Sequence, residues 1–192
     1  CISYLGLKGS IFIQLGYYKN MNQIIAITGP TGSGKSTVSL ALAKRIDRCV
    51  YIEVDHIKHM IISGFHKSDK GDGKVTWVYS EWKLVGETIG KISSNFLDHD
   101  FSVVIGGYMH SEGWEELENH VKITLKVALS PSRETIKIRD SERDEKYFMG
   151  EEAIEEHLDY LSNPKFSSFR KLDSSEQSVD ETVDEIIGML EA

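Results

Sequence analysis

One glycine-rich segment of nine residues constrains this chain more than any other feature. Residues 29–37 read G-P-T-G-S-G-K-S-T, which matches the spacing G-x-x-x-x-G-K-[S/T]. An apolar, β-branched run at residues 24–28 precedes the segment, and residues 35–46 have the apolar spacing of a helix. A buried strand, a glycine loop and a helix N-terminus in this order predict a loop that holds an anion on backbone N–H groups.

The residue types in this loop fit a nucleoside triphosphate, ATP, bound together with Mg²⁺. We expect Lys35 to place its charge between the β- and γ-phosphates, Ser36 to offer its hydroxyl to the metal, and Thr37 to reach the α-phosphate. The glycines let the backbone approach phosphate oxygens with no Cβ in between. The residues predicted to bind the nucleotide here are Gly29, Thr31, Gly32, Ser33, Gly34, Lys35, Ser36 and Thr37.

Length and composition limit the remaining possibilities. A chain of 192 residues has room for one domain, and 40% hydrophobic with 27% charged residues is an ordinary globular balance. The net charge of −8 argues against bulk binding to nucleic acid or to an anionic membrane, and no apolar run has the length of a membrane span. Only two cysteines occur, which fits a reducing, cytoplasmic setting. Oligomeric state does not follow from these features.

The region ahead of Met21 is interpreted separately. The chain begins with cysteine, and Met21 stands directly before the first predicted strand. We expect residues 1–20 to be an upstream or non-native extension and residues 21–192 to form the domain. The alternative is a genuine extra segment that packs on the domain.

Strand and helix patterns alternate from Met21 onward, which predicts a three-layer α/β domain with helices on both faces of a parallel sheet. The most regular pattern runs from residue 75 to residue 96, where apolar residues recur at steps of three and four and predict one long helix after a polar loop at 63–74. Trp82 falls on that apolar stripe and is expected in the core. The five expected strands are residues 24–28, 50–54, 101–105, 121–129 and 166–172.

The motifs that are present or missing distinguish between the possible reactions of the γ-phosphate. The strings N-K-x-D and D-x-x-G of switch GTPases do not occur, nor does the L-S-G-G-Q signature of transporter ATPases. Ligands of open α/β sheets bind beyond the carboxyl ends of the strands, where Glu53 and Asp55 are expected. Asp55 is therefore a candidate to take a proton from an acceptor hydroxyl or to orient it, with an N-cap of the next helix as the alternative. Arg139 and Arg143, four residues apart, either close over the phosphates or lie on an ordinary solvated helix.

From Met21 onward the chain resembles the small P-loop kinases grouped with chloramphenicol phosphotransferase, zeta toxin, gluconate kinase and shikimate kinase, within the wider AAA-type ATPase-like nucleotide-binding proteins. The matching pieces are I-T-G-P-T-G-S-G-K-S-T, Y-I-E-V-D-H-I, V-V-I-G-G, L-S-P-S-R-E-T-I-K-I-R-D-S-E-R and L-D-S-S-E-Q-S-V-D-E-T-V-D-E-I. The resemblance implies a P-loop fold with a five-stranded parallel sheet of order 2-3-1-4-5 and a lid around residues 140–150. It also implies that Asp55 serves the acceptor hydroxyl, that Arg139 and Arg143 begin the lid, and that the segment from Asp173 to Glu176 helps to form the adenine pocket.

The chain departs from this family at the end of the third predicted strand. Many relatives carry an acid there that helps to hold magnesium, whereas this chain has Gly106-Gly107. We therefore expect Glu53 to take over that metal role. Tyr108 and His110 either line the acceptor pocket or are ordinary surface residues.

The resulting prediction is an ATP-dependent phosphotransferase acting on a small molecule with a hydroxyl group. One alternative is a nucleotide-binding regulatory protein or slow ATPase without kinase activity, which the missing acid at Gly106 favours. The other alternative is a nucleoside monophosphate kinase or a kinase toxin of the zeta type.

Overall fold

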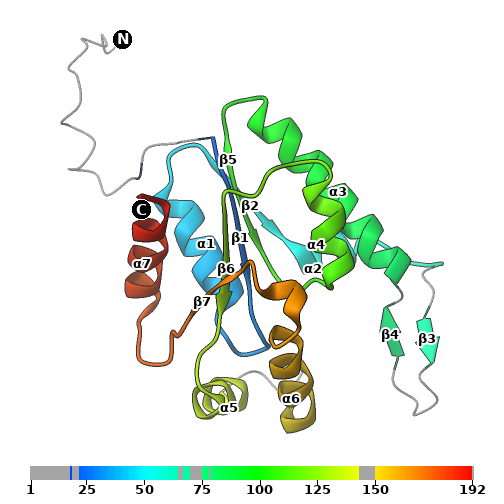
Figure 1. Ribbon diagram of the computed structural model, residues 1–192, viewed down its shortest axis with the longest axis vertical. Helices are drawn as coiled ribbons and strands as arrows, with labels where there is room; N and C mark the ends of the chain where they lie inside the picture. The colour runs from blue at the N-terminus through cyan, green and yellow to red at the C-terminus, as the bar shows by residue number, and fades with distance from the viewer. Residues whose placement is uncertain are drawn as a thin grey trace.

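The computed structural model describes residue 18 and residues 22–64, 67–69, 75–77, 79–142 and 150–191 (Figure 1). Its centre is a five-stranded sheet with the order β2-β5-β1-β6-β7, in which every neighbouring pair of strands is parallel. The strands are β1 (Ile24–Thr28), β2 (Cys49–Glu53), β5 (Ser102–Gly106), β6 (Leu125–Leu129) and β7 (Arg170–Leu172). Counted along the chain, this is the predicted order 2-3-1-4-5, so the predicted fold is confirmed.

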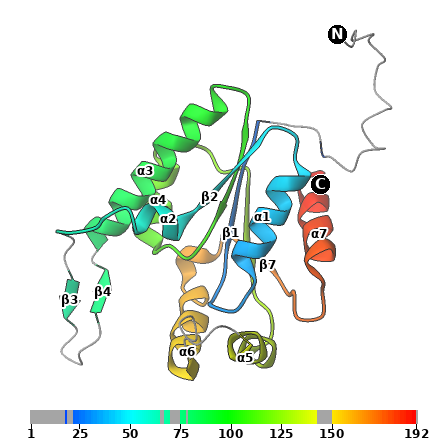
Figure 2. The same cartoon turned by 180° about the vertical axis from the view of Figure 1, so that it is seen from behind.

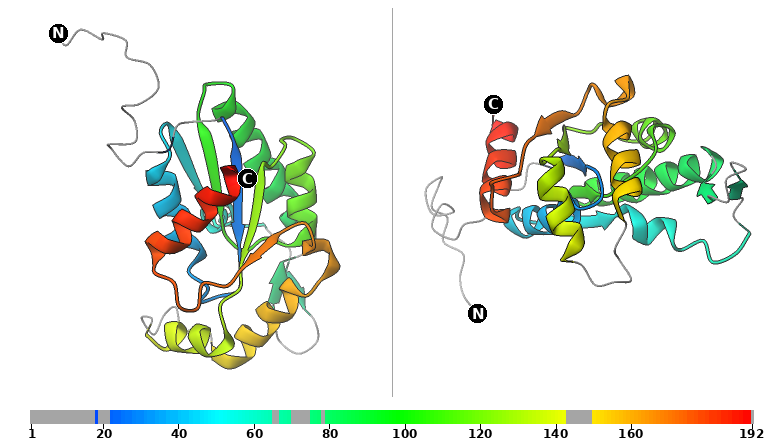
Figure 3. Two further views of the ribbon diagram at one scale, coloured as in Figure 1. Left: turned by 60° about the vertical axis from the view of Figure 1, so that its left-hand side comes forward. Right: turned by 90° about the horizontal axis from the view of Figure 1, so that it is seen from below.

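Helices cover both faces of the sheet (Figures 1 and 3). Helices α1 (Lys35–Arg45) and α7 (Val179–Glu191) lie on one face, and α3 (Tyr79–Leu97) and α4 (Ser111–Glu118) lie on the other. The central strand β1 is buried on both sides: Ile25 and Ile27 belong to the core with α1 and α7, while Ile24 and Ala26 belong to the core with α3 and α4. This alternation explains why residues 24–28 form a continuous apolar run.

Two helices lie beyond the carboxyl end of the strands, below the sheet in Figures 1 and 2. Helices α5 (Arg133–Ser141) and α6 (Gly150–Leu161) lie there, and the short helix α2 (Val54–Lys58) follows β2 directly. The turn η3 (Pro164–Phe166) connects α6 to β7. Of the lid expected at 140–150, residues 143–149 lie outside the described residues, while the backbone N–H of Gly150 donates to the buried carboxylate of Asp140 at 3.1 Å.

Several elements differ from the sequence prediction. An antiparallel hairpin of β3 (Lys67–Asp69) and β4 (Val75–Trp77) occupies part of the expected loop, and the long helix begins at Tyr79 instead of residue 75. The β-branched and aromatic residues of β4 favour a strand, and their spacing coincided with the helical period. The eight-residue helix α4 was not predicted. The fourth strand of the main sheet begins at Leu125 instead of residue 121.

The segment ahead of Met21 is described at one residue, Tyr18. Its backbone N–H donates to the carbonyl of Arg45 at 2.6 Å, and its carbonyl accepts from the N–H of Asp47 at 2.8 Å. Its side chain packs against the core beneath α1 and α7. A segment that packs on the domain would make such contacts, and the division at residue 20 stays a prediction.

Candidate nucleotide-binding site

The loop between β1 and α1 has the backbone that its glycines predict. Gly32 and Gly34 adopt left-handed conformations with φ of 77° and 86°, which residues with a Cβ rarely adopt. The N–H of Ser33 and the ammonium of Lys35 both donate to the carbonyl of Pro30 at 3.2 Å. The loop therefore curls back on itself, with Lys35 across it and the N-terminus of α1 behind it.

Helix α5 and the segment after β7 close one side of this loop. A Cβ on Gly32 would lie 3.0 Å from Cγ2 of Ile136 and 3.1 Å from its carbonyl oxygen, so the loop packs tightly against α5 at this glycine. The guanidinium of Arg139 donates to the carbonyl of Ser33 at 3.4 Å and to that of Ser174 at 3.0 Å. Arg139 thus connects the loop to a segment that is distant in sequence.

A cavity of about 210 Å³ lies at this junction. The side chains of Gln177 and Thr182 are held in place, because Nε2 of Gln177 donates to Glu185 at 2.6 Å and its Oε1 accepts from Thr182 at 3.1 Å. The hydroxyls of Ser33 and Ser174 are buried and have no hydrogen-bond partner among the described residues. Buried hydroxyls without a partner are costly, and these two oxygens are covered by protein atoms and are not open to the cavity. The residues that line the cavity are Ser33, Gly34, Thr37, Val38, Arg139, Ser174, Gln177, Val179 and Thr182.

Asp173 comes just before this cavity but does not line it. Its carboxylate is exposed and accepts hydrogen bonds from the N–H of Ser175 at 2.9 Å and from its hydroxyl at 2.5 Å. These bonds lower the pKa of Asp173. The hydroxyl of Ser175 also accepts from the N–H of Ser132, the N-cap of α5. Asp173 therefore stabilises the turn that carries Ser174.

An oxygen cluster lies across the loop from the cavity, at the end of β2. The hydroxyl of Ser36 donates to Oε1 of Glu53 at 3.2 Å, and the hydroxyl of Tyr51 donates to Oε2. Burial and the adjacent Glu53 carboxylate raise the pKa of Tyr51, so its hydroxyl keeps its proton and acts as the donor. Among the described residues, no group of three or more His, Cys, Asp or Glu side chains is arranged to hold a metal. The hydroxyl of Ser36 and the carboxylate of Glu53 nevertheless fit Mg²⁺, which usually takes only one or two protein oxygens beside phosphates and water.

Steric contacts explain why residue 106, at the end of β5, is a glycine. Gly106 pairs with Glu53 in the sheet, and a Cβ on it would lie 2.4 Å from Oγ of Ser39 and 3.0 Å from the Tyr51 ring. Ser39 and, at a slightly greater distance, the Tyr51 ring therefore fill the space that an acidic side chain would need at residue 106. The same tyrosine reaches Glu53, so the departure at Gly106 and the position of Glu53 are linked.

Asp55 lies in the first turn of α2, beside this cluster. The N-cap of α2 is Glu53, and no side chain caps the helix, so Asp55 does not serve as its cap. Its half-exposed carboxylate lies 3.6 Å from the ammonium of Lys58, which in turn lies 5.2 Å from the ring centroid of the buried Trp82. Asp55 is also close enough to contribute to the raised pKa of Tyr51.

The structure thus groups most of the predicted site residues at the carboxyl ends of the strands. Lys35, Ser36, Glu53 and Arg139 surround the loop, and Asp55 stands on the neighbouring helix. Arg143 lies outside the described residues. The geometry adds Tyr51 and Gln177 to the predicted residues, and it places Ser174, from the segment 173–176 that the resemblance links to the adenine pocket, at the cavity. Tyr51 carried a signal in the sequence, because it stands two residues before Glu53 and so faces the same side of the strand.

Comparison with known proteins identifies the fold. No protein-family model matches this sequence, and no curated protein matches it either. Among solved structures, a sugar kinase from Janibacter sp. HTCC2649 is similar with a TM-score of 0.67 and 15% identity, over 88% of this chain and 94% of that one. A gluconokinase from Sinorhizobium meliloti 1021 gives 0.66 and 20% over 90% and 93%. The APS kinase of Mycobacterium tuberculosis, in complex with AMPPNP and APS, gives 0.56 and 14% over 88% and 98%.

These likenesses, all at low identity, define the fold as that of the small P-loop kinases. The chain spans nearly the full length of the three kinases. Within the described residues, none of the helices has an apolar stretch long enough to pass through a membrane.

Proposed function

We propose that this protein transfers the γ-phosphate of ATP to a hydroxyl group of a small molecule, with Mg²⁺ bound beside the loop. The observation that carries the proposal is the convergence of three groups on one glycine loop: the Lys35 ammonium, the Arg139 guanidinium and the Ser36–Glu53 oxygen pair. Two cations and a metal-binding pair around an anion-binding loop suit a reaction that depends on positioning and on charge neutralisation. The kinase fold of the comparison structures adds support.

The triphosphate would bind along the backbone N–H groups of the loop and the N-terminus of α1. Lys35, which here donates to its own loop, would turn its ammonium to the β- and γ-phosphates. Arg139 already lies against the loop carbonyl and would stabilise the charge that develops on the transferred group. The base of ATP would occupy the cavity lined by Ser174 and Gln177.

Ser36 and Glu53 would hold Mg²⁺ directly or through water. The ion, when bound, neutralises phosphate charge and makes the γ-phosphate a better electrophile. Tyr51 fixes the orientation of Glu53 through its hydroxyl. The carboxylate would therefore be held in a fixed orientation for the metal, as metal ligands generally are by their hydrogen-bond partners.

Asp55 would accept the hydrogen bond of the reacting hydroxyl and take its proton as the oxygen attacks the γ-phosphate. The ammonium of Lys58 lies 3.6 Å from this carboxylate and helps to hold it in place. Asp55→Asn keeps the shape and removes the charge. We expect it to lower turnover about 10²- to 10⁴-fold and to leave ATP affinity within about twofold.

ADP release measured with and without a panel of sugars, polyols, sugar acids, nucleosides and nucleoside monophosphates tests the proposal. We expect at least one alcohol to accelerate ADP release in the presence of Mg²⁺. Stimulation by nucleoside monophosphates alone would instead identify a nucleotide kinase.

A second candidate function is nucleotide binding without transfer. Gly106 favours this function, because it supplies no carboxylate at the end of β5. Of these two strand ends, only that of β2 then offers an acidic ligand to the metal, which is Glu53. Tight ATP binding together with ADP release that no acceptor stimulates would support this candidate.

A further inference from the structure

The cavity beside the glycine loop is lined by one side-chain amide whose position is fixed by its neighbours. Gln177 lies between β7 and α7, is partly buried and lines the cavity. Its Nε2 donates to Oε2 of Glu185 at 2.6 Å, and its Oε1 accepts from the hydroxyl of Thr182 at 3.1 Å. Both partners belong to α7, so one helix holds the two ends of the amide.

Glu185 determines which way round the amide lies. At neutral pH a glutamate carboxylate only accepts hydrogen bonds, so the nitrogen of the Gln177 amide must face it and the oxygen must lie on the other side. The hydroxyl of Thr182 also donates to the carbonyl of Ser178 at 2.9 Å, and it shares its single proton between the two acceptors. After these contacts, the amide retains one N–H and one lone pair on its oxygen, in a fixed order.

The other groups at the cavity are less suited to the edge of a purine base. Arg139 has donors only, and its guanidinium already donates to the carbonyls of Ser33 and Ser174. None of the described residues that line the cavity has a carboxylate, which could accept from both the N1–H and the amino group of guanine. Adenine presents one amino group beside one ring nitrogen that accepts, and a primary amide pairs with such an edge through two hydrogen bonds.

We propose that Gln177 selects adenine over guanine in the phosphate donor, and that Glu185 is a positioning residue for its amide. This inference rests on the proposed function, in which the base of ATP occupies this cavity. Oε1 of Gln177 would accept from the amino group of adenine, and Nε2 would donate to N1. Guanine has a carbonyl oxygen in place of that amino group and a proton on N1, so each group of the amide would meet its like. An amide that could turn over would fit both bases, whereas the amide held by Glu185 fits adenine.

Binding of ADP and GDP, each with Mg²⁺, tests this without any phosphate transfer. Calorimetry on the full chain gives the two Kd values for wild type, Gln177→Ala and Glu185→Gln. We expect wild type to bind ADP about tenfold or more tightly than GDP, and Gln177→Ala to raise the Kd for ADP roughly five- to tenfold while that for GDP stays within about twofold. Equal affinities in wild type, or an unchanged preference in Gln177→Ala, would overturn the inference.

Glu185→Gln separates positioning from a structural role. A glutamine at residue 185 can donate as well as accept, so the amide of Gln177 could then turn over. We expect the Kd for GDP to fall roughly threefold or more, with the Kd for ADP raised by about threefold at most. A rise of both Kd values by the same factor would show that Glu185 only supports the fold and would overturn its positioning role.

Asp184→Asn is the control for charge. It removes a carboxylate from the neighbouring residue of α7, and that carboxylate pairs with Arg45 at 2.9 Å, at the end of α1 away from the glycine loop. The negative charge lost near the phosphates is therefore similar to that in Glu185→Gln, while the amide of Gln177 keeps its partners. We expect the wild-type ratio of the two Kd values, and a changed ratio would attribute the preference to charge and overturn the inference.

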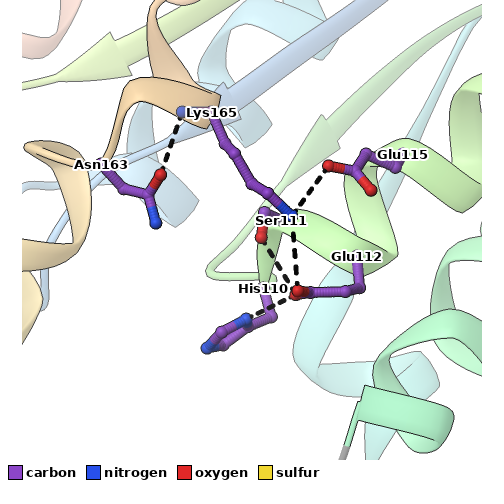
Figure 4. Close-up of polar contacts among 6 residues, drawn as sticks. All are labelled: His110, Ser111, Glu112, Glu115, Asn163 and Lys165. Atoms are coloured by element: carbon purple, nitrogen blue, oxygen red, sulfur yellow. Dashed lines mark hydrogen bonds and ion pairs between the residues drawn. The ribbon is translucent and has the colours of Figure 1, made fainter.

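Glu112→Gln is the control for lost stability. Figure 4 shows its carboxylate held by His110 at 2.7 Å, by Ser111 at 3.0 Å and by Lys165 at 3.5 Å. His110 stacks on Trp82 with ring centroids 6.3 Å apart, on the face of the sheet opposite to α7. This variant loses hydrogen bonds far from the cavity, so it should keep the wild-type preference. A preference lost here as well would overturn the role of Gln177.

The two proposals can fail separately. Preferential binding of ADP through Gln177 without any phosphorylated acceptor would refute the proposed transfer and leave the base recognition intact. A phosphorylated acceptor formed with equal kcat/KM from ATP and from GTP would refute the role of Gln177 and leave the transfer intact.

Discussion

At the residue scale, the contact between Ser36 and Glu53 is the most informative feature of the site. The hydroxyl comes from the first helix and the carboxylate from the end of the second strand, and they meet at 3.2 Å beside the glycine loop. Both are hard oxygen ligands of the kind that Mg²⁺ prefers. Tyr51 reaches the second oxygen of Glu53 because Gly106 leaves space for its ring. The metal role of Glu53 can therefore be tested by changing single atoms.

We predict that Glu53→Gln raises the Mg²⁺ concentration for half-maximal ATP turnover by about tenfold or more, because an amide is a weaker metal ligand than a carboxylate. Tyr51→Phe keeps the carboxylate and removes only its anchoring hydroxyl, so it should give a smaller shift in the same direction. Turnover is measured over a range of Mg²⁺ concentrations at saturating ATP. The same Mg²⁺ dependence in wild type and Glu53→Gln would exclude Glu53 as the ligand.

Glu112 makes a pH-dependent contribution to stability. Its pKa in the folded protein is about 2, below the ordinary value of 4.5, so its hydrogen bonds stabilise the fold fully above about pH 4.5. That stabilisation is lost as the pH falls from 4.5 toward 2. We predict that Glu112→Gln lowers the free energy of unfolding by about 1 kcal/mol at pH 7, since part of the side chain is exposed, and that the difference shrinks below pH 4. Urea unfolding at pH 7, 5 and 3.5 measures it; a difference that is constant over this range would contradict the account.

At the scale of elements, glycines determine how closely α3 and α4 pack. A Cβ on Gly86 of α3 would lie 2.0 Å from the carbonyl oxygen of Gly113 in α4, and a Cβ on Gly113 would meet Met109 and the carbonyl of Trp82 at under 3 Å. Backbone atoms cannot move away as a flexible side chain can. The two helices must therefore separate if a side chain is introduced, and this would also displace Trp82 beneath His110.

We predict that Gly86→Ala lowers the free energy of unfolding by about 1–3 kcal/mol through overpacking. The matched control is Gly188→Ala in α7, where a Cβ meets nothing within 4 Å. There the higher helix propensity of alanine should stabilise the protein by about 0.5–1 kcal/mol. Chemical denaturation of both variants checks the signs, and a Gly86→Ala protein as stable as wild type would show that the helices are not closely packed.

The elements also show how far a sequence alone predicts the structure. The strand, glycine loop and first helix were predictable, because their residue types are required by local backbone geometry. The hairpin of β3 and β4 was missed because Val75 fits the three-and-four spacing of the helix that follows. The contact of Arg139 with Ser174 could not be predicted, since it depends on packing between segments 35 residues apart. The role of Tyr51 was partly predictable. Strand alternation places it on the same face as Glu53, but the sequence does not show that Gly106 leaves room for its ring.

At the scale of the whole molecule, the proposed nucleotide site joins the glycine loop, α5 and the start of α7. A ligand that binds only the folded protein stabilises it by about 2.7 kcal/mol at a concentration of 100 times Kd. We predict that ATP raises the Tm of the full chain by several degrees, and that Lys35→Ala abolishes most of this shift. Lys44→Ala, an exposed change in the last turn of the same helix, is the control and should respond to ATP like wild type. Equal shifts in the Lys35 and Lys44 variants would place ATP elsewhere.

The central claim is that the γ-phosphate moves from ATP to a hydroxyl under the control of Asp55. Mass spectrometry of reactions with ATP, Mg²⁺ and a panel of polyols, sugar acids and nucleosides tests it most directly, with wild type and Asp55→Asn compared at equal occupancy by ATP. The account predicts a phosphorylated acceptor from wild type and about 10²-fold or greater loss of it in the variant. ADP and free phosphate without any phosphorylated acceptor, or equal product from both proteins, would contradict it.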